Sequence, residues 1–143
     1  MDRRSWTRAV LLYLALQSLL LGAWALLAPR SFYDDFPGAG RSWVAVDGPF
    51  NEHLVRDVGA LNLALLVLLL AAVRSLHRDL VVVAAIASAV WGVPHLVYHA
   101  LNTDGLAGSD VAASLGGLAV FAALPFTLLL WPVESSQPRA ESS

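Results

Sequence analysis

The chain has 143 residues, of which 57% are hydrophobic and only 14% are charged, and its formal net charge is -2. A soluble domain is typically about one quarter charged, so this composition indicates an integral membrane protein, and the length fits one domain. The charge balance gives no reason to expect a nucleic-acid partner, and the absence of cysteine excludes disulfides and thiolate metal sites.

Four apolar stretches approach or exceed the roughly 20 residues that a helix needs to cross a bilayer. In chain order they cover residues 9–28, 53–73, 80–101 and 111–131. The first follows a basic start, MDRRSWTR, but it is longer than a signal-peptide core and ends at Pro29-Arg30 rather than at a small-residue cleavage site, so we expect it to be retained. The sequence therefore predicts an all-α fold, an up-down four-helix transmembrane bundle forming one domain over residues 1–133.

The first connection, residues 29–52, is the longest, and its aromatic side chains favour a lid at the membrane surface over a disordered loop. Pro49 suits the first turn of the second helix, which Asp47 or Asn51 is expected to cap. Beyond the fourth helix, residues 134–143 read as a disordered polar tail.

Basic residues predict the orientation, because arginines favour the cytoplasmic side of a membrane. Arginines precede the first helix at positions 3, 4 and 8, and two more, Arg74 and Arg78, lie in the short second connection. Acidic residues predominate in the first and third connections. Both termini are therefore expected in the cytoplasm, with residues 29–52 and the third connection outside.

Two histidine-containing pairs lie in apolar surroundings. His95 and His99 in HLVYH are four residues apart, as are His53 and Asp57 in EHLVRD, so each pair shares one face of its helix. If the second and third helices are antiparallel neighbours, equal rise per residue puts His53 level with His99 and Asp57 level with His95. We therefore expect three imidazoles and a carboxylate to converge near the outer membrane surface.

Such a cluster suits a transition metal ion: zinc, iron, manganese or copper, with His53, Asp57, His95 and His99 as ligands. Tyr98, Glu52 and Asp110 are candidates to surround these ligands. Haem fits less well, because two histidines one turn apart would compete within one haem site. If the protein is an enzyme, a metal-activated water could attack a lipid or other amphiphile with Glu52 or Asp57 as proton acceptor, and redox chemistry is equally compatible.

Other interpretations stay open. The histidines could form a hydrogen-bonded polar cluster that exchanges protons or binds a quinone or lipid, with Ser88 and Trp91 deeper on roughly the same face. They could also be incidental polar groups at the membrane surface, with His53 paired to Asp57 and Glu52 paired to Arg56. His77, among arginines in RSLHRD, is expected to be an ordinary solvated loop residue.

RDVGALNLALLVLLLAA, residues 56–72, combines a polar entry, a small-residue patch and a leucine-rich run. This stretch and the four-span layout resemble the DoxX-like group of small bacterial membrane proteins. The resemblance implies a multi-pass protein of the bacterial plasma membrane. Because some members are described as subunits of quinone-linked oxidoreductases, it also implies a non-catalytic accessory subunit with a membrane-complex partner. Membrane lipid is a further expected partner, and the sequence leaves open whether the chain forms a homo-oligomer. Small residues such as Gly59, Gly92, Gly116 and Gly117 would let helices approach closely. The histidine pairs do not belong to that group's pattern, so no residue role is transferred.

Overall fold

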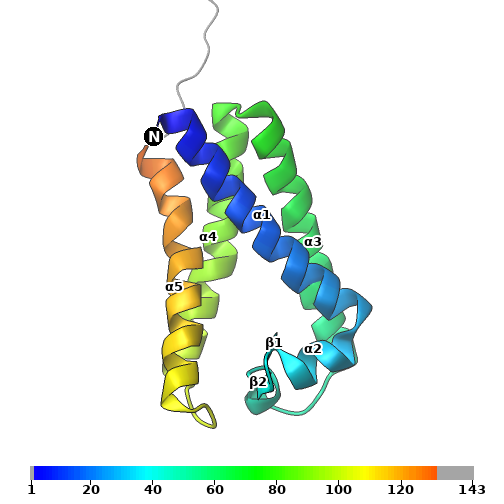
Figure 1. Ribbon diagram of the computed structural model, residues 1–143. Helices are drawn as coiled ribbons and strands as arrows, with labels where there is room; N and C mark the ends of the chain where they lie inside the picture. The colour runs from blue at the N-terminus through cyan, green and yellow to red at the C-terminus, as the bar shows by residue number, and fades with distance from the viewer. Residues whose placement is uncertain (1, 132–143) are drawn as a thin grey trace, which may run out of the picture.

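Four long helices dominate the computed structural model, which describes residues 2–131 (Figure 1). They are α1 (Arg3–Leu27), α3 (Glu52–Ser75), α4 (Arg78–Leu101) and α5 (Gly108–Leu130). Each has 23 to 25 residues and is apolar enough to cross a membrane. At about 1.5 Å per residue the shortest spans about 35 Å, more than the hydrocarbon core of a bilayer. The chain is thus a helical bundle with four membrane-length helices, as predicted.

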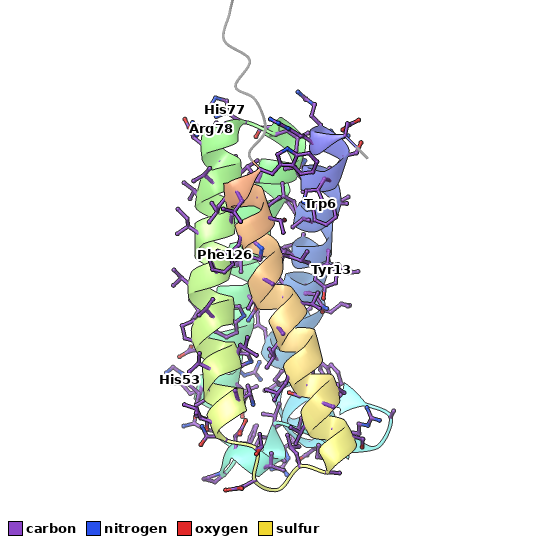
Figure 2. The ribbon with its side chains drawn as sticks, turned by 90° about the vertical axis from the view of Figure 1, so that its left-hand side faces the viewer. Trp6, Tyr13, His53, His77, Arg78 and Phe126 are labelled. Carbon is purple, nitrogen blue, oxygen red and sulfur yellow. The ribbon has the colours of Figure 1, made fainter. Side chains whose placement is uncertain are left out.

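The long helices run alternately up and down and pack as two pairs, α1 with α3 and α4 with α5 (Figure 1). The N-terminus, the α3–α4 connection and the end of α5 lie at one end of the molecule, which we call the terminal end. Residues 28–51 and 102–107 lie at the other, which we call the loop end. At the terminal end the Trp6 indole nitrogen donates to the Thr127 hydroxyl oxygen at 3.1 Å and joins α1 to α5. Trp6, His77 and Arg78 are all found there in Figure 2.

The buried apolar residues form two separate clusters. The larger joins all four long helices toward the terminal end and includes Leu14, Leu69, Ala84 and Leu128. The smaller lies at the loop end and contains Ala25, Phe32 and Val55, with aromatic side chains packed around them. Neither buried set includes a residue of α4 after Ala85 or of α5 before Phe121. The halves of α4 and α5 nearest the loop end therefore contribute no buried residue to either cluster, although Trp91 packs against the larger one.

The connection predicted as residues 29–52 is more regular than the sequence indicates. It contains a short helix, α2 (Pro29–Asp35), two paired strands, β1 (Pro37–Gly38) and β2 (Arg41–Ser42), and a 3-10 turn, η1 (Ala45–Asp47). Pro29 occupies the first turn of α2, where a missing N–H costs nothing. The Arg30 guanidinium and the Asp34 carboxylate, one turn apart, approach to 2.6 Å. The aromatic rings of this segment pack on one another, as a folded lid requires.

The long helices begin before the predicted apolar runs, and in α1 and α3 a polar side chain caps the first turn. α1 begins at Arg3 rather than at residue 9, because the Asp2 carboxylate accepts a hydrogen bond from the Ser5 amide at 2.7 Å. α4 begins at Arg78 rather than at residue 80, and α5 at Gly108 rather than at residue 111. Asn51, one of the two expected caps, starts α3 by accepting from the Leu54 amide at 3.1 Å. The predicted tail, residues 134–143, lies outside the described residues.

Candidate functional site

Three aromatic side chains follow one another along the loop-end half of α4. The ring of Trp91 stacks on that of His95, with centroids 5.2 Å apart and an interplanar angle of 17°. The His95 and His99 rings meet edge to face at 4.7 Å, as expected for residues one helical turn apart. We call Trp91, His95 and His99 the histidine ladder. Tyr98 contacts the edge of the ladder at His99, with ring centroids 5.3 Å apart. The predicted shared face of the two histidines, with Trp91 deeper on it, is confirmed.

Both imidazoles of the ladder are half-buried, yet neither has a hydrogen-bond partner among residues 2–131. The ring nitrogens are therefore available to a bound group. Ser88, by contrast, donates to the Ala84 carbonyl at 2.8 Å within its own helix and is fully buried, so it is not available to a site.

Helix α5 places a hydroxyl at the level of the ladder. Gly92 of α4 packs against Phe121 and Ala122 of α5. Because antiparallel helices rise equally, counting seven residues onward from Gly92 and seven back from Phe121 brings His99 level with Ser114. Ser114 is buried, with only 8% of its surface exposed. A buried polar side chain thus lies at the depth of His99.

Asp47 of the first connection has a carboxyl group that is sensitive to the charge of His99. Burial raises the pKa of the Asp47 carboxyl above its ordinary value, and the nearby His99 acts in the opposite direction as a positive charge. Asp47 was expected only as a possible cap of the second helix. Asn51 takes that role, and Asp47 instead ends the η1 turn. Nothing in the sequence separates these two roles.

The second predicted pair, His53 and Asp57, faces away from the bundle. The His53 Nε2 and Asp57 Oδ2 atoms are 3.3 Å apart, and the two side chains are 88% and 54% exposed. Figure 2 shows His53 at the margin of the molecule. The surface pair named as an alternative in the sequence analysis is therefore present.

The four predicted ligands do not form one group. Among residues 2–131, no three histidine, aspartate or glutamate side chains lie close enough together to hold a metal ion. Equal depth in the membrane does not determine which way a side chain points. Helix α3 packs more extensively on α1 than on α4, and it turns Val55, Gly59 and Asn62 inward. His53 and Asp57 lie on another face. The expected convergence is thus corrected, whereas metal binding itself stays a prediction.

The remaining candidates are engaged elsewhere. Glu52 pairs with Arg56 at 2.8 Å, as the surface alternative predicts, and Arg56 also donates to the Leu26 carbonyl at the end of α1. Asp110 pairs with Arg41 of the first connection at 3.1 Å. Glu52 and Asp57, the two predicted proton acceptors, are therefore each paired with a neighbour on α3. Neither belongs to the histidine ladder.

The sequence matches no protein-family model, no curated protein and no solved structure. The resemblance to the DoxX-like group, with the membrane-complex partner that it implies, therefore stays a prediction.

Proposed function

We propose that this membrane protein binds a transition metal ion through His95 and His99 of the histidine ladder. The observation that carries the proposal is the pair of adjacent, half-buried imidazoles without protein hydrogen-bond partners among the described residues. Two histidines one helical turn apart can offer nitrogen ligands to one metal ion, and imidazole suits zinc, copper, iron and nickel. The proposed ligand set is thus narrower than the four residues that the sequence suggested.

Elemental analysis of the untagged protein, purified in detergent, tests this function. The wild type is expected to hold about one equivalent of metal, which His95→Ala combined with His99→Ala should remove. His77→Ala is the matched control, because it removes an exposed histidine in the α3–α4 connection. His53→Ala separates the two ligand sets: loss of metal in this variant would favour the original four residues. A folded wild type without metal after incubation with each ion would overturn the proposal.

A second candidate is a quinone-like amphiphile whose polar head accepts or donates hydrogen bonds at the ladder. Stacking of Trp91 on His95 favours it, because a planar ring can extend such an aromatic column. Organic extraction of the purified protein, followed by mass spectrometry, distinguishes the candidates. A stoichiometric aromatic lipid that is lost in the His95→Ala variant, without metal, would support this second function.

We also propose that the loop end faces outward across a bacterial plasma membrane. The fold gathers Arg3, Arg4 and Arg8 with Arg74 and Arg78 at the terminal end, which supports a cytoplasmic location for that end (Figure 1). Because the chain has no cysteine, His77→Cys and Asp104→Cys each introduce a single thiol. In intact cells a membrane-impermeant thiol reagent should label the Asp104→Cys protein and spare the His77→Cys protein. The reverse pattern would refute the orientation.

A further inference from the structure

The arginines at the two ends of the molecule differ in their partners. Toward the loop end, every described arginine pairs with a carboxylate at 3.1 Å or less: Arg30, Arg41 and Arg56. At the terminal end, four exposed arginines have no carboxylate partner among residues 2–131: Arg4, Arg8, Arg74 and Arg78. We call these four the terminal arginines. Their charge is therefore available to a partner outside the described part of the chain.

The terminal arginines lie where the long helices reach the membrane surface. Each is in the first or last two turns of its helix, because α1 begins at Arg3, α3 ends at Ser75 and α4 begins at Arg78. Trp6 and Trp131 lie at the same end, and the Arg3 guanidinium carbon is 5.5 Å from the centre of the Trp131 ring. Tryptophan at the end of a membrane helix is typical of the headgroup region. The terminal arginines are therefore placed to reach lipid headgroups.

The protein itself supplies little negative charge at this end. Among residues 2–131 the carboxylates there belong to Asp2 and Asp79, and Asp2 already accepts a hydrogen bond from the Ser5 amide as the cap of α1. Arg4 and Arg8 are four residues apart on α1, so their like charges repel across one helical turn. A group with negative charge bound between them would relieve this repulsion.

We propose that the terminal arginines bind the headgroups of anionic phospholipids in the membrane leaflet that they face. Their position at the ends of membrane-length helices, beside tryptophans, favours a phospholipid over a soluble anion. A cluster of at least four arginines next to a membrane span attracts anionic lipid electrostatically. The loop end offers no such surface, because carboxylates outnumber arginines there. What the histidine ladder binds does not affect the terminal arginines.

Lipid association in a bilayer tests the proposal. The protein is reconstituted in phosphatidylcholine vesicles that contain a trace of spin-labelled phosphatidylglycerol or spin-labelled phosphatidylcholine. Electron paramagnetic resonance then gives the fraction of each labelled lipid that is held at the protein. The wild type should hold phosphatidylglycerol at least about 2-fold more strongly at low ionic strength, and added salt should reduce this preference. The combined replacements Arg4→Gln, Arg8→Gln, Arg74→Gln and Arg78→Gln should abolish it.

Two control variants make the result specific. Arg30→Gln combined with Arg41→Gln removes two arginines that already have carboxylate partners, so it should keep the preference for phosphatidylglycerol. The four Arg→Lys replacements at the positions of the terminal arginines preserve the charge and should also keep the preference. Circular dichroism establishes that each variant is folded.

Four outcomes would overturn the proposal. A folded wild type without a preference for phosphatidylglycerol would exclude anionic lipid and favour an acidic protein as the partner of the terminal arginines. An equal loss in the variant with Arg30→Gln and Arg41→Gln would show that net charge, rather than this surface, attracts the lipid. Loss of the preference in the lysine variant would refute an electrostatic attraction. A preference that inorganic phosphate abolishes at constant ionic strength would assign the surface to a soluble anion.

Discussion

Gly59 of α3 lies against the backbone of Leu26 in α1, so closely that a β-carbon at position 59 would be 2.5 Å from the Leu26 amide nitrogen. The Gly22 carbonyl oxygen would be only 2.9 Å from the same added atom. The two helices therefore meet backbone to backbone near the loop end. This contact fixes which face of α3 turns inward, and with it the outward direction of His53 and Asp57.

Replacing Gly59 by alanine should destabilise the protein, because the obstructing atoms belong to the backbone and cannot rotate away. We expect the free energy of unfolding to fall by about 2–3 kcal/mol, the range for overpacking at a tight contact. Thermal unfolding in detergent, followed by circular dichroism, measures the loss. Gly117→Ala is the control: an added β-carbon there meets no atom within 4 Å, and alanine is the better helix former. Equal melting temperatures for both variants would contradict the close contact.

Arg56 should matter more for its contact with α1 than for its ion pair. It donates to the Leu26 carbonyl near the end of α1, where helical carbonyls lack intrahelical partners. We expect Arg56→Gln to cost about 1–2 kcal/mol, typical of a hydrogen bond to a charged group, and Glu52→Gln to cost less than about 0.5 kcal/mol, because the pair is exposed. Unfolding of the two variants and the double variant measures both terms. A larger effect of Glu52→Gln would reverse the assignment.

Asp47 should make the metal-free protein less stable as the pH rises. Its folded pKa is above the ordinary value of 3.8, so the folded state binds the proton more tightly than the unfolded state. Its contribution to stability is therefore complete below pH 3.8 and is lost as the pH rises through the folded pKa. At neutral pH, Asp47→Asn should raise the melting temperature, and the difference should vanish on acidification below the ordinary value. Melting curves recorded at several pH values with a chelator present provide the measurement. A difference in melting temperature between variant and wild type that grows on acidification would contradict the prediction.

The long helices were predictable because an apolar run of membrane length has few alternatives in a chain without long polar segments. The shared face of Trp91, His95 and His99 was predictable for a similar reason, since spacing alone defines it within one helix. Which neighbouring helix a given face turns toward was not predictable from the sequence. Counting residues along the chain gave the depth of His53 and Asp57 in the membrane. The contact of Gly59 with α1 decided that their side chains point outward. The sequence shows Gly22 and Gly59 as small residues and does not say that they meet.

The first connection, residues 29–52, also shows what local sequence patterns cannot predict. Asp47 and Asn51 are both good helix caps, and only the structure shows that Asn51 is the cap and that Asp47 instead ends the η1 turn. The pair of Arg41 with Asp110 joins residues far apart in the chain, and two charges of opposite sign carry no signal that they are neighbours. The contacts that attach the first connection to α5 and to the α4–α5 connection are therefore tertiary and cannot be derived from local patterns.

Because the long helices pack as two pairs, the protein should assemble from two separately produced polypeptides. The link between the pairs is the short stretch at Leu76 and His77, whereas α1 with α3, and α4 with α5, are each held by their own extensive packing. A gene split after codon 76 would yield two polypeptides, each with two membrane-length helices that can insert as a hairpin. Because the larger buried cluster draws on both halves, the separately translated pieces should find each other in the bilayer and reassemble.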